Sequence, residues 1–244
     1  MEFIKDGVPK VGPEYLQPTE FFDFDKDEVR RFAYDAIKGA ETAKGKAVKL
    51  YYAVRDSIRY DPYCIRLERD LFRASSVLAA GAGFCIPKAN LLVACARAVG
   101  IPTGIGLSDV VNHLCTERLA RIMGGKELFI HHGYAVLHLD GKWIKAAPAF
   151  NIELCNKFDV LPTDFDGEHN ALFQEFDAHG RRHMQYVADH GIWSDFPFER
   201  VAKDFRDYYP ESFFVDAERE RINREFDAEK AAKRAEFEEE KPLA

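Results

Sequence analysis

The pattern of apolar positions predicts helices in the N-terminal part of the chain. Apolar side chains recur at helical spacing over residues 29–37, after an acidic start at residues 23–28. A second stretch with this spacing covers residues 42–58, and Tyr60-Asp61-Pro62 ends it. Residues 88–99 are apolar on almost every side, which is typical of a helix at the centre of a domain.

Beyond residue 102 the pattern changes from helices to strands. Residues 103–113 are typical of a strand that passes into a loop. Residues 132–139 and 142–146 predict two strands joined at Asp140-Gly141, a dipeptide that favours a tight hairpin. Because helices come first and antiparallel strands follow, the order predicts an α+β fold rather than alternating βαβ units.

The same pattern divides the chain into four segments. Residues 1–22 carry prolines and aromatics without periodicity, and we interpret them as an N-terminal arm lying on the domain. Residues 23–157 form the predicted core. Residues 158–215, rich in Asp, His and aromatics with one short helical stretch near 182–188, are interpreted as a flank or lid. Residues 216–244 predict a charged C-terminal helix with a solvated face, and partner binding is the alternative role.

Composition and charge narrow the functional classes. At 244 residues, of which 47% are hydrophobic, the chain is long enough to bury a core as one domain. A formal net charge of -7 argues against nucleic acid as a partner, because phosphate contacts need clustered lysines and arginines. The chain contains no GxGxxG or Walker-type phosphate loop, no HExxH and no zinc-finger spacing, so we expect neither a nucleotide cofactor nor a metal.

The cysteines indicate a reducing compartment. They are five in number, widely spaced and without a CxxC pair, which disfavours a disulfide framework: Cys64, Cys85, Cys95, Cys115 and Cys155. The N-terminus lacks the apolar region of a signal peptide, and no run reaches the roughly 18 apolar residues of a membrane span. We therefore expect a soluble cytoplasmic protein without a membrane partner. No pattern in the sequence indicates its oligomeric state.

A lone cysteine stands at the entrance of the apolar helix, in Gly81-Ala82-Gly83-Phe84-Cys85-Ile86-Pro87. Pro87 suits the first turn of a helix, so the unpaired amides and the positive end of the helix dipole would face the sulfur. Such a position lowers the pKa of a thiol and can hold a developing oxyanion. The alternative is a small buried structural residue, which is how we interpret Cys95.

Nucleophilic catalysis by cysteine also needs a neighbouring imidazole and a polar group that orients it. His132 is the best candidate for the base, because it begins a predicted strand, and a strand fixes a side chain better than a loop does. His131 is the alternative. On a strand the two side chains would point to opposite faces, so only one of them could meet Cys85.

Five short motifs follow one another between residues 74 and 143: Ala74-Ser75-Ser76-Val77-Leu78, Gly81-Ala82-Gly83-Phe84-Cys85, Ala98-Val99-Gly100-Ile101-Pro102, His132-Gly133-Tyr134 and Gly141-Lys142-Trp143. Together they resemble the core of the transglutaminase-like superfamily over roughly residues 42–151. The resemblance implies a papain-related fold, in which a cysteine begins a central helix packed on an antiparallel sheet that supplies His and Asp. It also implies that Cys85 is the nucleophile and His132 the general base.

The chain departs from the family pattern at the third member of the triad. In the family an Asp-Pro pair follows the tryptophan by four and five residues, and here Ala147 stands at the position of the aspartate after Trp143. An alanine cannot orient an imidazole, and loss of the orienting group lowers the rate of a triad enzyme by orders of magnitude.

Three residues are candidates for the missing role. Asn151 lies close to the aspartate position, and papain-like enzymes resemble this solution in using an asparagine. An ordinary cap or turn after the strand is the alternative for Asn151. A carboxylate from the following segment, Asp164 or Asp166, is another candidate.

The sequence thus predicts cysteine-dependent acyl transfer on an amide of a peptide or protein. Cys85 would attack the carbonyl carbon, His132 would protonate the leaving amine, and Asn151 would orient the imidazole. Transfer of the acyl group to water makes the protein an amidase or peptidase, whereas transfer to an amine makes it a transglutaminase-type enzyme. The alternative is a catalytically silent transglutaminase-like scaffold that binds a peptide or protein partner.

Overall fold

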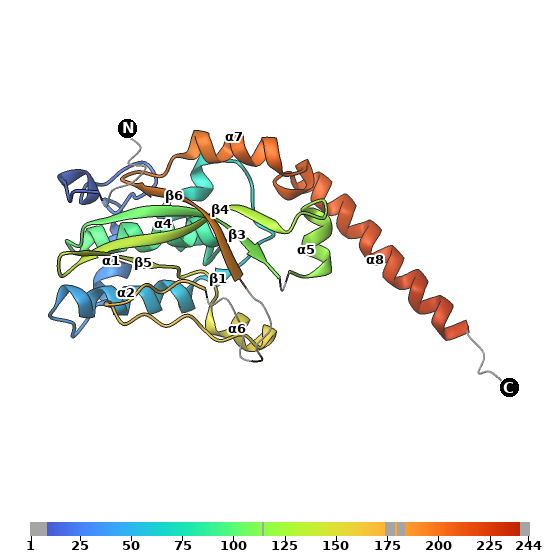
Figure 1. Cartoon of the computed structure of the whole chain (residues 1–244), viewed down its shortest axis with the longest axis horizontal. Helices are drawn as coiled ribbons and strands as arrows, with labels where there is room; N and C mark the ends of the chain where they lie inside the picture. The colour runs from blue at the N-terminus through green and yellow to red at the C-terminus, as the bar shows by residue number, and fades with distance from the viewer. Residues whose placement is uncertain (1–8, 114, 174–178, 180–183, 240–244) are drawn as a thin grey trace.

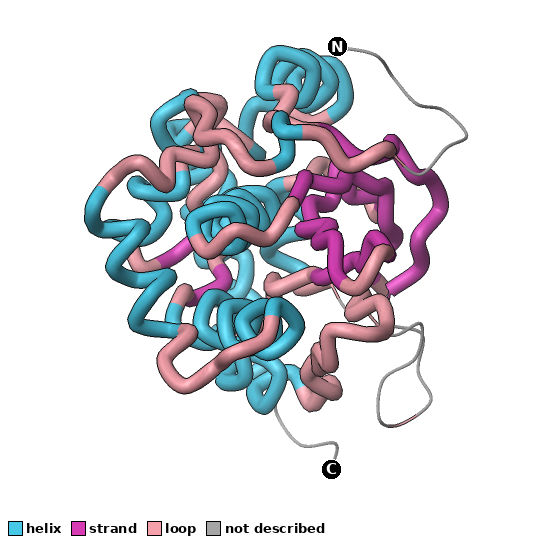
Figure 2. Tube along the Cα trace, turned by 90° about the vertical axis from the view of Figure 1, so that its left-hand side faces the viewer, coloured by secondary structure: helices cyan, strands magenta, loops and turns pink. Residues whose placement is uncertain are grey.

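The computed structural model describes residues 9–113, 115–173, 179 and 184–239. Helices come first along the chain, and a four-stranded antiparallel sheet follows. Figure 2 shows the strands gathered on one side of the molecule and most of the helices on the other. The α+β class that the order of the elements predicts is therefore confirmed.

Three helices surround a fourth. They are α1 (Asp27–Ala36), α2 (Ala43–Ser57) and α3 (Ala74–Ala80), and each packs against α4 (Cys85–Ala98). Every side chain of α4 from the second to the thirteenth residue is buried, as its apolar sequence predicts. The helix is the centre of the core, and its first residue is the cysteine at the predicted entrance.

The sheet covers one side of α4 and has the strand order β5-β4-β3-β6 (Figure 1). Its strands are β3 (Thr103–Asn112), β4 (Leu128–Leu139), β5 (Lys142–Ala146) and β6 (Met184–Trp193). β4 and β5 form the predicted hairpin at Asp140-Gly141, whose two turn residues have φ of +47° and +80°. Positive φ at both positions is what a two-residue turn of this kind requires.

A pair of short parallel strands leads the chain into α4. β1 (Arg59–Tyr60) pairs with β2 (Ala82–Gly83), and the backbone N–H of Asp61 donates to the carbonyl of Gly83 at 3.0 Å. This pairing fixes the segment just before Cys85 and holds the Tyr60 side chain beside it.

The regular register between β3 and β4 breaks near one end of the sheet. Ser108 pairs with His132 but Val110 pairs with Phe129, so that one residue of β3 lies opposite two residues of β4. His131 is one of those two, and its φ is +56°. A β-bulge of this kind bends the strand and redirects its side chains.

The fourth strand comes from the segment interpreted as a flank or lid. β6 pairs with β3, whereas we expected a short helical stretch near residues 182–188. That expectation is wrong for residues 184–188, which lie in β6, and residues 182 and 183 lie outside the described ranges. β6 is an edge strand with many exposed side chains, so it lacks the alternation of a half-buried strand. The four-stranded sheet therefore extends beyond residue 157.

The remaining elements are short or lie toward the termini: η1 (Pro13–Tyr15), η2 (Arg69–Phe72), α5 (Glu117–Ile122), α6 (Ile152–Phe158), α7 (Phe198–Tyr208), η3 (Glu211–Phe213) and α8 (Asp216–Glu239). The N-terminal arm contributes Phe21 and Phe22 to the core. α8 packs on α5 and η3 and then runs away from the body of the molecule (Figure 1). Among the helices of the described ranges, none has the length and apolarity of a membrane span.

Candidate active site

Cys85 begins α4, and several backbone amides face its sulfur. Phe84 is the N-cap and supplies no side-chain acceptor to the first turn, so the amides there carry the positive end of the helix dipole. The N–H groups of Cys85 itself, Ile86 and Gly133 act on the thiol through hydrogen bonds that favour its ionised form. Because Gly133 belongs to β4, the sulfur lies where the start of the helix meets this strand.

Burial outweighs these amides. Desolvation raises the pKa of the Cys85 thiol to about 11, although the bonds from Gly133 and Ile86 lower it. The apolar surroundings include Val110, Phe129 and Phe150. The sequence predicted a lowered pKa from the helix end alone, and it did not reveal this apolar wall. The thiol is therefore neutral at pH 7 in the resting protein.

His132 shares a cavity of about 40 Å³ with Cys85. The histidine is 5% exposed, and its ring packs on Phe173 and Tyr186 at centroid distances of 5.2 and 6.0 Å. Desolvation lowers the pKa of His132 to about 4, so the ring is neutral at pH 7. No hydrogen bond joins the Cys85 sulfur to this ring in the described part of the chain. The site thus pairs a neutral thiol with a neutral imidazole.

A larger cavity of about 420 Å³ adjoins the one at Cys85. The two cavities share Tyr60, Phe129 and Phe150 in their walls. α6 closes the larger cavity with Leu154 and Phe158. Its size and mostly apolar walls are typical of a site for a small ligand or a side chain.

Asn151 lines the larger cavity and not the one that holds Cys85 and His132. Its Oδ1 accepts a hydrogen bond from the backbone N–H of Tyr60 at 3.1 Å, and its Nδ2 lies 3.4 Å from a carboxylate oxygen of Glu153. The side chain is 3% exposed. The structure therefore brings Cys85 and His132 together and leaves Asn151 bonded elsewhere.

Asp164 and Asp166 also have other partners. Asp164 is largely exposed, and its Oδ1 lies 3.3 Å from the Tyr52 hydroxyl and 3.4 Å from Arg55. Asp166 is bonded to the ring of His169 at 2.7 Å. Neither carboxylate contacts His132 among the described contacts.

Among the described contacts, His131, the alternative base, has a carboxylate partner and His132 has none. Its Nε2 lies 2.7 Å from Oδ2 of Asp204 on α7, and the residue is 3% exposed. Both histidines line the cavity at Cys85. Their rings contact different residues, since His131 packs on His190 and His132 packs on Phe173.

A comparison with models of protein families agrees with the fold described above. Residues 30–148 match the model for the core of the transglutaminase-like superfamily. This segment belongs to the transglutaminase-like superfamily. The resemblance noted from the sequence is thereby confirmed.

Two solved structures are similar to part of the chain. A protein of Cytophaga hutchinsonii named "putative cysteine protease" has 17% identity and a TM-score of 0.44, over 59% of this chain and 43% of its own. A "putative protease" of Parabacteroides distasonis has 18% identity and a TM-score of 0.36, over 52% of this chain and 26% of its own. The chain thus spans less than half the length of either protein. No curated protein matches it significantly.

Ala147 stands where the resemblance leads us to expect an aspartate. Ala147 is buried beside Tyr134 and Val136. Nε2 of His132 is buried and has no hydrogen-bond partner among the described residues. A buried ring nitrogen without a partner is uncommon in folded proteins and costs free energy.

Sequence reasoning missed Asp204. It lies more than 70 residues after the histidines on α7, a helix whose Phe205 and Tyr209 side lines the cavity at Cys85. The amphipathic pattern of residues 198–208 was the signal available for this helix. No spacing rule links a carboxylate on it to a histidine in a bulge.

Proposed function

We propose that the protein transfers acyl groups through a thioester at Cys85, with His132 as the general base. The observation that carries the proposal is the junction of α4 and β4, where backbone amides face the Cys85 sulfur and His132 lines the same cavity as Cys85. A nucleophile, a base and donors for an oxyanion are the parts that acyl transfer needs.

The neutral pair determines how the first step proceeds. Sγ of Cys85 attacks the amide carbonyl carbon while its proton passes to His132, so thiolate and imidazolium need not form beforehand. The N–H groups of Ile86 and Gly133 stabilise the negative charge on the carbonyl oxygen. The C–N bond then breaks, the leaving amine takes the proton from His132, and the acyl group stays on sulfur as a thioester.

The thioester passes to water or to a second amine, and we propose hydrolysis as the main outcome. The substrate is a peptide or protein whose apolar side chain occupies the larger cavity, next to Tyr60 and Phe150. A volume of about 420 Å³ is sufficient for an aromatic side chain together with neighbouring backbone.

Asn151 remains the proposed orienting residue for His132. To take this role, Oδ1 of Asn151 would release the backbone N–H of Tyr60 and accept the ring N–H of His132. Substrate bound in the adjoining cavity would have to stabilise this new arrangement. Replacement of Asn151 by Ala then lowers turnover as well as stability, whereas a purely structural Asn151 lowers stability alone.

Trapping of the acyl-enzyme tests the proposal. The protein is incubated with the p-nitrophenyl ester of an N-acylated phenylalanine, quenched in acid, and weighed by intact-protein mass spectrometry. We expect one acyl group on Cys85, none in Cys85→Ala, and wild-type acylation in Cys64→Ala. Cys64 is a matched control because burial raises its pKa to about 11 as well. Acylation of Cys64 at a comparable rate would contradict the proposal.

A second candidate function is a silent scaffold that binds a peptide or protein partner. The unpartnered Nε2 of His132 and the alanine at position 147 favour it, because a triad without an orienting group loses most of its rate. In this case wild type forms no acyl-enzyme, and Cys85→Ala binds aromatic peptides as tightly as wild type does. The trapping experiment therefore separates the two functions.

A further inference from the structure

A second polar cluster lies beside the Cys85 cavity, on three neighbouring strands. Asp109 on β3, His131 on β4 and His190 on β6 each offer one possible ligand atom, and these atoms lie within 4.8 Å of one another. The strands are irregular at this place, because the pairing of β3 shifts around Asp109 on both of its edges. The three residues thus lie side by side where the pairing of three neighbouring strands is irregular.

Hydrogen bonds hold the three residues in position. Oδ1 of Asp109 accepts the backbone N–H of His131 at 3.0 Å and lies 2.8 Å from Nε2 of His190. The rings of His131 and His190 are 4.7 Å apart between centroids. From α7, Asp204 forms a hydrogen bond with Nε2 of His131, and Arg200 lies 3.7 Å from the same carboxylate oxygen.

One atom of the cluster has no partner. Nε2 of His131 lies 2.7 Å from Oδ2 of Asp204, and because a carboxylate accepts, Nε2 carries the N–H of this bond. Nδ1 is then the ring nitrogen that is left to bind a metal. Nδ1 is buried and unpartnered among the described residues. A buried lone pair beside a carboxylate and a second imidazole is the environment that a cation satisfies.

We propose that Asp109, His131 and His190 bind one divalent transition-metal ion, with Asp204 as the carboxylate that orients His131. An imidazole that ligates a metal commonly donates its other N–H to a carboxylate, as His131 does to Asp204. The site is distinct from the proposed nucleophile and base, and acyl transfer at Cys85 does not depend on it.

The ligand set selects the class of metal. Two imidazoles and one carboxylate suit zinc and its first-row neighbours, whereas calcium and magnesium prefer sets of oxygen ligands. Three protein ligands leave a position for water. At Nε2 of His190 the ion takes the place of the hydrogen shared with Asp109, and this hydrogen moves to Nδ1 as the ring changes tautomer.

Zinc titration of the full chain tests the proposal. Competition with a chromophoric chelator should give one zinc ion per chain. Binding should disappear in His190→Asn and in Asp109→Asn. Asp204→Asn should weaken it by about 10–100-fold, the usual effect of losing a partner behind a ligand. Zinc should raise the melting temperature of wild type but not that of His190→Asn or Asp109→Asn.

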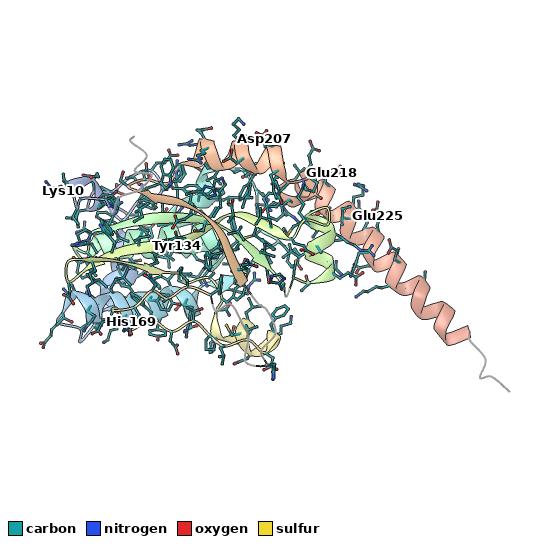
Figure 3. All side chains as sticks on the ribbon, in the orientation of Figure 1. Lys10, Tyr134, His169, Asp207, Glu218 and Glu225 are labelled. Atoms are coloured by element: carbon teal, nitrogen blue, oxygen red, sulfur yellow. The ribbon has the colours of Figure 1, made fainter. Side chains whose placement is uncertain are left out.

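Two controls keep the result specific. His169→Asn removes an exposed histidine that is also 2.7 Å from a carboxylate, beside α2 (Figure 3), and should bind zinc as wild type does. Cys85→Ala should also keep the site, and cobalt in wild type should show no sulfur-to-metal charge-transfer band. Binding that survives in His190→Asn, or that is lost in Cys85→Ala, would overturn the proposal. So would a wild type without a stoichiometric site.

Discussion

Cys85 and His132 are held in states that oppose ionisation. Burial raises the pKa of the thiol to about 11 and lowers that of the imidazole to about 4. A charged pair would be favoured only if each ion compensated the desolvation of the other. The resting site is therefore neutral, and in the proposed reaction the proton moves during attack rather than before it.

The lowered pKa of His132 predicts a loss of stability in acid. An unfolded histidine takes up a proton near pH 6.5, and folded His132 does so near pH 4, so the folded state loses stability as the pH falls between these values. From pH 7 to pH 4 the free energy of unfolding should fall by about 3 kcal/mol more in wild type than in His132→Gln. Urea unfolding at a series of pH values measures this.

His169→Gln is the control for that series. Asp166 raises the pKa of the exposed His169, so this histidine contributes stability in acid and loses it as the pH rises. Its removal should therefore not protect the protein at pH 4. If the free energy of unfolding fell by the same amount with pH in wild type and in His132→Gln, the result would contradict a buried, neutral His132.

At the residue scale the sequence predicted two partners of the site and not their surroundings. Cys85 and His132 were proposed from a helix start and a strand start, which are local patterns. The partner of His131 was not found, because Asp204 approaches through the packing of α7 on the sheet. The pKa values also depend on side chains contributed by distant segments, such as Phe129 and Phe150.

The contact between α4 and β4 decides the geometry of the site at the scale of elements. Gly133 has no Cβ, and one built there would lie 2.8 Å from Cα of Ile86, the residue after Cys85. The strand thus approaches the backbone of the helix, which is what lets the Gly133 amide face the sulfur. Only glycine permits this approach.

Gly133→Ala should therefore disturb both stability and the site. Because the new methyl group meets backbone rather than a flexible side chain, we expect the free energy of unfolding to fall by about 1–3 kcal/mol. Chemical denaturation measures it. Gly45→Ala, inside α2, is the control and should be neutral or stabilising by up to about 1 kcal/mol. Equal stabilities for the two variants would contradict the close approach.

The elements that the sequence predicted are those with strong local patterns. The central helix, the Asp140-Gly141 hairpin and the helix of residues 42–58 lie where they were expected. β6 was missed because an edge strand gains its backbone partners from β3 and shows little periodicity of its own. The bulge at His131 was also missed, since register depends on both strands at once.

At the scale of the whole molecule, the cavity at Cys85 is assembled from most of the chain. Its walls range from Tyr60 on β1 to Phe205 on α7 and Phe213 on η3. Described residues of the segment interpreted as a flank or lid therefore build one wall of the site.

α8 is anchored to this body by one buried arginine. Nη2 of Arg219 donates to the carbonyls of Ile65 and Phe213 at 2.6 and 2.8 Å, and Nη1 pairs with Asp216 at 2.7 Å. The residue is 6% exposed. The cation thus joins the start of α8 to two separate parts of the fold.

Arg219→Ala should lower the free energy of unfolding by about 1.5–3 kcal/mol, because charge-assisted bonds to buried carbonyls are lost. Arg221→Ala is the matched control on the same helix. Arg221 pairs on the surface with Glu218 and Glu225, which Figure 3 labels, and its loss should change stability by less than about 0.5 kcal/mol. Thermal or urea unfolding compares the two, and similar losses would show that the buried contacts do not anchor α8.

The central claim is that Cys85 acts as a nucleophile with His132 as its base. The most direct test is the rate at which a peptidyl vinyl sulfone with an aromatic side chain modifies the protein at pH 7, with the adduct mapped by mass spectrometry. The account predicts one adduct, on Cys85, formed at least about 100-fold more slowly in His132→Asn. An adduct formed equally fast on Cys64, or a rate unchanged in His132→Asn, would contradict it.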